Sequence, residues 1–302
     1  MLPVKTTNLT KVYKAKKGSR IEALVDLNLE ISPGEVIGFL GPNGAGKSTT
    51  IKALLGLIRP TSGSAELFGI PVEHSAARQR VGYLPENPSF YDSMTAREYL
   101  TMVGRIFGMT TDALASESDR VLDLLDLTTA ARRPIRNYSK GMVQRLGIAQ
   151  TLLHDPDLYI LDEPMSGLDP IGRSLVKKIM LELKQRGKTV FFSTHVTADV
   201  EAVCDRVGII VAGRLRTIRP VQDVLQGGIN GYEVHVRGGK MPTGVGIELI
   251  ESRQDMHVYY VANNEMANFM MTFGQKGGEI HLMETRRKDL EAFFLDIVKS
   301  ES

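Results

Sequence analysis

A glycine-rich stretch near the start of the chain has the residue types needed to bind phosphate. It ends in one lysine and two hydroxyl residues and reads Gly41-Pro42-Asn43-Gly44-Ala45-Gly46-Lys47-Ser48-Thr49. Glycines let the backbone turn tightly and bring its N–H groups close to an anion, because no Cβ intervenes. Lys47 adds a mobile positive charge for the outer phosphates, and the Ser48 hydroxyl is placed to hold Mg²⁺. A glycine-rich turn with an incidental Lys-Ser pair is the alternative, since such motifs also occur by chance.

The segments on either side of this stretch favour phosphate binding. An apolar run at 36–40 precedes it, and a helix-like segment at 50–55 follows it. Strand, glycine loop and helix in that order are the context that a phosphate-binding loop requires. The helix that begins beside Lys47 would direct the positive end of its dipole at the same anion.

Two carboxylates follow a second apolar run. The run at 158–161 is continuous, which predicts a strand buried on both faces of a parallel sheet, and Asp162 and Glu163 come at its end. Ligands of open α/β sheets bind at this end of the strands. Asp162 could therefore be an outer ligand of Mg²⁺, and Glu163 could orient and deprotonate a water for attack on a terminal phosphate. A pair of solvated carboxylates is the alternative.

Three other residues have both a chemical and an ordinary interpretation. His195 follows the apolar strand 189–193, which places it at the same sheet edge as Asp162, but a packed core histidine is the alternative. Ser139 suits the N-cap of a helix and could do no more than that. Tyr13 is the aromatic residue nearest the glycine loop in sequence, so its ring could stack on a purine base or simply belong to the core.

Apolar periodicity predicts an α/β fold. Short strands are expected at 4–13 and 22–31, and a mainly helical insertion at 95–127, where apolar residues recur at helical spacing. Further strands are expected at the following positions: 36–40, 65–68, 81–84, 158–162, 189–193 and 207–211. We expect a P-loop core with a mainly parallel sheet, preceded by an antiparallel β part.

The pattern changes past about Ile218. Residues 226–231 suggest a glycine-rich linker, and 232–237 alternates as a half-exposed strand does. More strands are expected at 247–250 and 256–261, with a closing helix around 290–298. The sequence thus predicts a main domain at 1–218, with a helical subdomain at about 87–155, and a small α+β accessory domain at 219–302.

Composition excludes several classes of protein. The 302 residues are 42% hydrophobic and 24% charged, which is ordinary for a globular chain, and the length suits about two domains. A net charge of +2 is too small to argue for nucleic acid as a partner. The single cysteine, Cys204, excludes an internal disulfide. No apolar run approaches the roughly 20 residues of a membrane span, so another chain would have to supply any membrane part.

Together, the motifs resemble those of the ATP-binding cassette (ABC) ATPases, and the resemblance covers about residues 1–218. The loop at 41–48 resembles Walker A, and 158–162 resembles Walker B. The resemblance implies that Glu163 is the catalytic glutamate, with His195 as the switch histidine.

Two further motifs extend the resemblance. Residues 138–142, Tyr-Ser-Lys-Gly-Met, resemble the family's signature motif, and 166–169, which end in Asp169, resemble its D-loop. Tyr13 falls where the family stacks adenine. The implied ligands are ATP and Mg²⁺, with Tyr13, residues 41–49, Ser139, Gly141 and Asp169 around the nucleotide.

The sequence departs from the usual family pattern at two places. Glu86 stands where the family usually has Gln, and a carboxylate there could also reach Mg²⁺ beside Ser48 and Asp162. Lys140 and Met142 replace a Gly and the Gln of the usual signature, whereas Ser139 and Gly141 remain. This form is similar to a branch whose ATPases are separate subunits of ABC-2 type exporters.

The resemblance implies a mechanism that needs two copies. One chain holds ATP in its loop but lacks donors on the far side of the γ-phosphate. Ser139 and Gly141 of a second copy, or of a close paralogue, would complete the cage in a head-to-tail dimer. A separate integral-membrane permease would dock on the helical insertion, where Phe90, Tyr91 and Phe107 are candidate contacts beside a plain packing role. The implied location is cytoplasmic, on the inner face of the cell membrane.

Two other classes of function compete with a transport ATPase. Cassette ATPases of translation or DNA maintenance usually carry two cassettes or a long coiled coil, and this sequence has neither. A nucleotide sensor without catalysis is the other, and the presence of Lys47, Asp162, Glu163 and His195 argues against it.

Overall fold

The chain forms two compact units, Met1–Pro220 and Val221–Ser300. A computed structural model describes residues 1–14, 19–225, 229–238, 243–275, 278–287 and 289–300. Ile218 lies in the last strand of the first unit. Each unit has its own hydrophobic core.

The first unit contains two sheets, and the α/β fold expected from the sequence is confirmed. One sheet is antiparallel and has the order β2-β1-β4-β5. Its strands are β1 (Val4–Lys14), β2 (Arg20–Ile31), β4 (Ser62–Leu67) and β5 (Ile70–Pro71). The second sheet has six strands in the order β10-β9-β3-β8-β7-β6. They are β3 (Val36–Leu40), β6 (Val81–Leu84), β7 (Leu158–Asp162), β8 (Thr189–Thr194), β9 (Arg206–Val211) and β10 (Arg214–Pro220).

The strands of the second sheet are parallel except for β10, which runs antiparallel to β9. The carboxyl ends of β3, β7 and β8 therefore meet at one edge, where the loops after them can share a site. Edge strand β10 was not expected from the sequence; its burial is only intermediate, so its apolar signal is weak.

Both faces of this sheet are buried, which explains its continuous apolar runs. Ile160 and Phe191 belong to a core shared with the antiparallel sheet and α1 (Lys47–Leu54). Tyr159 and Phe192, one position away on the same strands, belong to a second core with the other helices. Because side chains alternate along a strand, each run serves two cores at once.

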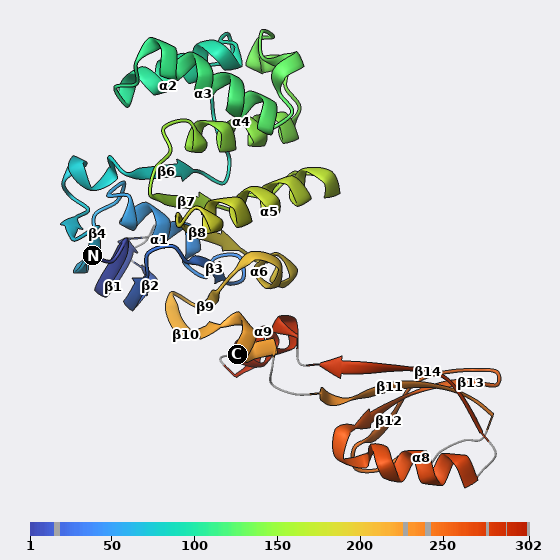
Figure 1. Ribbon diagram of the computed structural model, residues 1–302. Helices are drawn as coiled ribbons and strands as arrows, with labels where there is room; N and C mark the ends of the chain where they lie inside the picture. Colours follow the sequence, from blue (N-terminus) through green and yellow to red (C-terminus); the bar gives the residue numbers. More distant parts are fainter. Residues whose placement is uncertain (15–18, 226–228, 239–242, 276–277, 288, 301–302) are drawn as a thin grey trace. The chain divides into compact units, whose positions relative to one another are not determined.

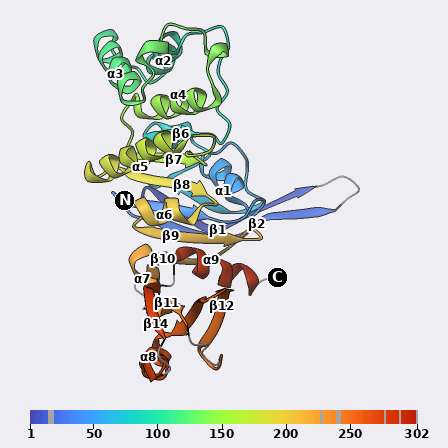
Figure 2. The ribbon, with the colours of Figure 1, turned by 90° about the vertical axis from the view of Figure 1, so that its right-hand side faces the viewer.

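Helices cover the face of the six-stranded sheet that carries Tyr159 and Phe192, and they also form the insertion between strands (Figures 1 and 2). They are α2 (Ala96–Ile106), α3 (Thr111–Leu124), α4 (Lys140–Leu152), α5 (Pro170–Gln185) and α6 (Thr197–Val203). The expected insertion at 95–127 holds two helices, because Thr95 and Thr110 each cap a new start. Short 3₁₀ turns occupy Ser75–Arg78, Thr128–Ala130 and Ile135–Asn137.

The second unit is a four-stranded antiparallel sheet with helices, in the order β12-β13-β11-β14. Its elements are α7 (Val221–Leu225), β11 (Ile229–Arg237), β12 (Ile247–Arg253), β13 (Met256–Ala262), a 3₁₀ turn (Asn263–Glu265), α8 (Met266–Gln275), β14 (Glu279–Arg287) and α9 (Leu290–Lys299). Phe269 and Phe273 of α8 pack against the sheet, where Phe269 contacts Tyr259 of β13. Of the predicted linker 226–231, residues 226–228 lie outside the described residues, and 229–231 already belong to β11.

Among the described residues, no helix has the length and apolar character to cross a bilayer.

Candidate functional site

The glycine loop joins β3 to α1 as its sequence predicts. Gly46 is the N-cap of α1 at φ 111°, where a Cβ would lie 2.6 Å from the carbonyl oxygen of Ala23. A Cβ on Gly41 would lie 2.5 Å from the carbonyl oxygen of Ile210. Both positions therefore require glycine, because the backbone of the loop passes close to the carbonyl oxygens of Ala23 and Ile210.

The glycine loop lines one side of a cavity of about 410 Å³. Its lining consists of Ile21, Glu22, Ala23, residues 42–49, Glu86 and Glu163. The structure thus brings Lys47, Ser48 and Glu86 together with Glu163, which lies 116 positions after Lys47 in the sequence. The backbone N–H groups at the start of α1 and the helix dipole favour an anion in this cavity.

Lys47 is the buried cation of the cavity, with only 7% of its surface exposed. Its Nζ donates to the carbonyl oxygens of Gly41, at 2.7 Å, and Pro42, at 3.3 Å. The same Nζ lies 3.5 Å from Oε1 of Glu163. The ammonium group is therefore fixed where it faces both the loop and the carboxylate.

Asp162 ends β7 and is 2% exposed. Its Oδ1 accepts a hydrogen bond of 2.6 Å from the hydroxyl of Ser193, which is itself fully buried on the neighbouring strand β8. The same carboxylate adds to the effect of burial in raising the pKa of Tyr83 on β6. A buried charge with so few partners is suited to a cation close by.

Glu163 adopts a backbone conformation that is unusual for a residue with a side chain. Its φ is 48°, in the left-handed region, which costs on the order of 1–3 kcal/mol unless the surroundings fix it. Its N–H donates to Oγ of Ser193 at 3.0 Å, and its carbonyl accepts from the N–H of Ser166 at 3.0 Å. Nε2 of the buried Gln144 donates to the carbonyls of Glu163, at 3.4 Å, and Pro164, at 3.1 Å. These contacts hold the turn that directs the side chain into the cavity.

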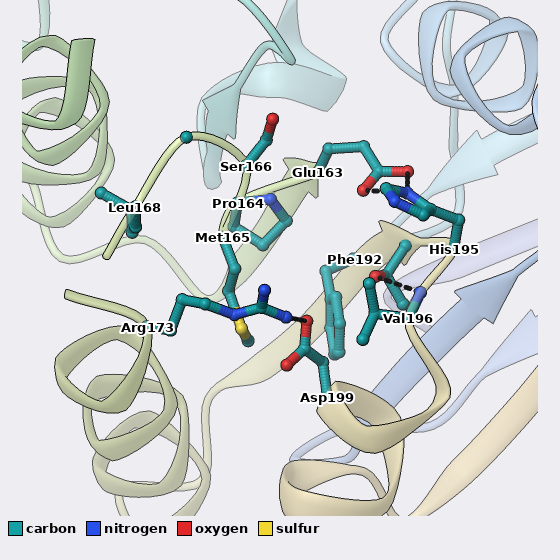
Figure 3. Close-up of a pocket in the computed structure, with 12 residues that line it drawn as sticks. Glu163, Pro164, Met165, Ser166, Leu168, Arg173, Phe192, His195, Val196 and Asp199 are labelled. Atoms are coloured by element: carbon teal, nitrogen blue, oxygen red, sulfur yellow. Dashed lines mark hydrogen bonds and ion pairs between the residues drawn. The ribbon is translucent and has the colours of Figure 1, made fainter. Parts of the chain in front are cut away.

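His195 follows β8 and faces the carboxylate of Glu163 (Figure 3). Its Nδ1 lies 3.1 Å from Oε1 and 3.0 Å from Oε2. The imidazole is 56% exposed, whereas Glu163 is 12% exposed. The sheet edge therefore joins His195 to Glu163, and Glu163 to Lys47.

The residues at this edge fit Mg²⁺ bound with a nucleotide. Among the described residues, no three His, Cys, Asp or Glu side chains gather as a metal site of their own. Magnesium commonly takes one or two carboxylates and completes its shell with phosphate oxygens and water. The buried Asp162 at the strand end and the Ser48 and Glu86 side chains at the cavity provide that type of donor.

Tyr13 and Asp169 lie outside the cavity. Tyr13 is 37% exposed near the end of β1, and Nζ of Lys11 lies 5.0 Å from its ring centroid. Asp169 is the N-cap of α5 and accepts from the N–H of Gly172 at 2.8 Å. Neither residue lines the cavity within the described part of the chain.

Ser139 and Gly141 also lie outside it. Ser139 is the N-cap of α4, and its Oγ accepts from the N–H of Met142 at 3.3 Å. A Cβ on Gly141 would fit without a clash, since its nearest neighbour, the carbonyl oxygen of Gly167, would lie at 3.7 Å. This chain by itself does not bring the signature residues into the cavity of its own loop.

Ser193 and Gln144 were missed by the sequence reasoning. Ser193 had a signal, because it is the polar residue that ends the apolar run of β8, as Asp162 ends that of β7. Gln144 had none, since a single glutamine in a helix is normally exposed.

Residues 24–166 match the family model described as ABC transporter. An ABC transporter ATP-binding protein of Synechocystis sp. is 40% identical over 301 residues, 97% of this chain and 83% of that protein. The bacitracin transport ATP-binding protein BcrA of Bacillus licheniformis is 37% identical over 277 residues, 91% of this chain and 87% of that one. The Nod factor export ATP-binding protein I of Cupriavidus metallidurans is 35% identical over 283 residues, 91% of this chain and 92% of that one.

The fold gives the same result. A dimeric ATP-binding cassette in a post-hydrolysis state, bound to ADP and Pi, superposes with a TM-score of 0.67 at 25% identity, over 72% of this chain and 98% of that one. The match extends beyond the cassette in the full-length relatives, since the Synechocystis alignment covers nearly the whole chain. The chain therefore belongs to the ABC transporter family, as an ATP-binding subunit with ATPase activity.

Proposed function

We propose that this chain hydrolyses ATP with Mg²⁺ between two copies of itself, or itself and a close paralogue, to drive export through a separate ABC-2 type permease. The observation that carries the proposal is the cluster of Lys47, Glu163 and His195 at one end of a parallel sheet, with contacts of 3.5 Å and 3.0 Å between neighbours.

The residues of the loop and of the sheet edge have roles that their positions support, whereas Tyr13, which does not line the cavity, takes its role from the resemblance to the family. The N–H groups of the loop and the Lys47 ammonium bind the phosphates of ATP, and Tyr13 stacks on the adenine. Ser48, Asp162 and Glu86 would hold Mg²⁺, directly or through water, and the ion would neutralise charge on the phosphates. Glu163 accepts the proton of the attacking water. His195 keeps the Glu163 carboxylate oriented.

The second copy supplies the missing side of the site. Ser139 and Gly141 stand at the N-terminus of α4, a helix of 13 residues, and they do not line the cavity of their own chain. In a head-to-tail dimer they face the γ-phosphate held by the other copy, and Asp169 at the start of α5 lies at the same interface. ATP would hold the copies together, and hydrolysis would release them.

A partner surface on the helical insertion suits a membrane permease. Tyr91, Ile106 and Phe107 are 64%, 75% and 42% exposed there, more than core packing requires. Phe90 is only partly exposed, and its ring packs at 84° to that of Tyr99 with centroids 4.7 Å apart. Phe107 also has a packing partner, since its ring stacks on that of His154. Docking of permease helices on this surface would place the chain at the cytoplasmic face of the membrane. The export direction follows the Nod factor relative.

A mixing experiment tests the shared site. Lys47→Ala removes the phosphate contact of one copy, and Gly141→Glu places a carboxylate where the partner's nucleotide should lie. A Cβ at position 141 would make only ordinary van der Waals contacts, and thermal unfolding of Gly141→Glu shows whether the variant chain is folded. Each variant alone is expected to lack activity, since both sites of its dimer are damaged. A mixture forms dimers in which one site pairs Lys47 of one copy with Gly141 of the other.

Phosphate release from the mixture, with permease-containing membranes present, is therefore expected to exceed the sum of the two variants. Activity equal to that sum would overturn the shared site. If the parent chain releases no phosphate under these conditions, a nucleotide sensor replaces the ATPase.

A further inference from the structure

We propose that Ser193 is a positioning residue of the ATPase site, whose single hydroxyl orients the carboxylate of Asp162, which would hold Mg²⁺, and fixes the backbone turn at Glu163. This inference rests on the proposed function, because it assigns a role within the same metal and nucleotide site. Ser193 touches no reacting atom itself; it acts through its two acidic neighbours.

The register of the sheet places the hydroxyl between them. Asp162 and Ser193 are paired residues of the parallel strands β7 and β8. Ser193 is fully buried, so solvent does not compete for its hydroxyl. Any residue with a longer or apolar side chain at this position would lose one or both contacts.

The two hydrogen bonds use the hydroxyl in different ways. The backbone N–H of Glu163 can only donate, so Oγ of Ser193 accepts at 3.0 Å. Oγ has one proton, and the ionised carboxylate of Asp162 can only accept, so that proton goes to Oδ1 at 2.6 Å. The direction of both hydrogen bonds is therefore fixed by the chemistry of the two partners.

The first consequence concerns the metal. Because Oδ1 accepts the hydrogen bond from Ser193, the orientation of the whole Asp162 carboxylate is fixed relative to β8, and this carboxylate would hold Mg²⁺ directly or through a water. Hydrogen bonds behind a ligating carboxylate fix its orientation, and losing one typically costs about 10–100-fold in metal affinity or activity.

The second consequence concerns the general base. The left-handed backbone of Glu163, at φ 48°, persists only where its surroundings fix it. Ser193 accepts from the backbone N–H of Glu163, and Gln144 and Ser166 donate to its carbonyl oxygen, so both backbone groups of the residue are held. One buried hydroxyl is thus bonded to both acidic residues and fixes the position of the proposed metal ligand relative to that of the proposed base.

The test is Ser193→Ala, with Thr189→Ala as a matched control. Thr189 lies on the same strand, is 2% exposed, and its hydroxyl accepts from the N–H of Gly34 at 2.9 Å. It therefore also loses one buried hydroxyl contact, but at the opposite end of β8. Thermal unfolding of both variants shows whether each is folded.

The readout besides ATPase activity is the binding of Mn²⁺, used as a spin probe for the Mg²⁺ site, with a non-hydrolysable ATP analogue. Electron paramagnetic resonance is expected to show affinity weakened by about 10–100-fold in Ser193→Ala. Metal-free binding of the analogue is expected to match the parent, because the glycine loop is intact. Ser193→Thr, which keeps a hydroxyl, is expected to recover Mn²⁺ binding.

Parent-like Mn²⁺ affinity in folded Ser193→Ala would overturn the inference, and so would an equal loss in Thr189→Ala. A different result marks failure of the proposed function itself: the parent chain would bind Mn²⁺ no better with the nucleotide than without it.

Discussion

Nδ1 of His195 lies 3.1 Å and 3.0 Å from the two carboxylate oxygens of Glu163, so one ring nitrogen bridges both (Figure 3). The contact joins the loops that follow β7 and β8, which are parallel neighbours. An ionised carboxylate only accepts hydrogen bonds, so Nδ1 carries the proton and donates. The imidazole thereby limits the rotation of Glu163, and the carboxylate fixes the tautomer of His195.

Glu163→Gln is expected to separate binding from hydrolysis. The amide keeps the size of the side chain but cannot take the proton of the attacking water, so turnover should fall by about 10²–10⁴-fold. The glycine loop and Lys47 are unchanged, so ATP binding should be retained and an ATP-bound dimer should accumulate. Phosphate release measures the first effect, and light scattering with MgATP the second. Turnover near that of the parent would remove Glu163 as the base.

Lys47→Ala is expected to weaken ATP binding by about 10–100-fold, since a hydrogen bond to a charged group contributes about 1.5–3 kcal/mol. Calorimetry with ATP measures the change. Lys52→Ala is the matched control, because Lys52 is an exposed lysine on the same helix, α1. An unchanged affinity in Lys47→Ala, or an equal loss in both variants, would contradict the assignment of the phosphate loop.

The sequence predicted the edge at which the site lies because of a general property of parallel sheets. Asp162 and His195 each follow a buried apolar run, and such runs end on one side of the sheet. Neither the partners of Glu163 nor its φ of 48° could be predicted, because they depend on the strand register that pairs Asp162 with Ser193. No local pattern fixes that register.

The second unit was less predictable. Helix α8 was missed because its apolar residues, which include Phe269 and Phe273, occupy one short segment that could equally form a strand. Strand β14 was missed because it is an edge strand with many charged side chains, and edge strands commonly carry such charges. In the proposed dimer, Ser139 faces the nucleotide of the other copy, and the structure of one chain does not contain that contact.

His154 is expected to make the fold less stable in mild acid. Its ring stacks on Phe107 with centroids 3.6 Å apart, its Nε2 lies 3.3 Å from the carbonyl oxygen of Val81, and burial lowers the pKa of the imidazole. A lowered folded-state pKa favours the neutral ring. The stability it contributes is therefore complete above the unfolded pKa of about 6.5 and is lost as the pH falls through the folded value.

Urea unfolding across this pH range measures the effect of His154. The variant His154→Gln should show a smaller loss of stability on acidification than the parent, whereas His74→Gln, at an exposed histidine, should follow the parent. The neighbouring charges of Asp155 and Lys188 act on this ring in opposite directions and are present in all three proteins. Equal slopes in the parent and His154→Gln would contradict the prediction.

Asp199 on α6 connects two helices beside the site, and its removal should cost less than the removal of its partners. Its side chain is 3% exposed and lies 2.8 Å from Nη2 of Arg173 on α5 (Figure 3). It also lies 3.0 Å from Nζ of Lys177 on the same helix. Arg173 and Lys177 are 36% and 28% exposed, so water can solvate them if Asp199 is lost. Asp199 has no such access if they are lost.

The double variant Arg173→Met with Lys177→Met leaves a buried charge without its partners, which should cost about 3–5 kcal/mol. Asp199→Asn should cost less, because both cations can turn toward water. Lys178→Met, which loses an exposed pair with Glu182, should cost about 0–1 kcal/mol. Urea unfolding of the three proteins measures the order of these losses. An Asp199→Asn variant less stable than the double variant would show that the cations, and not the carboxylate, depend on this contact.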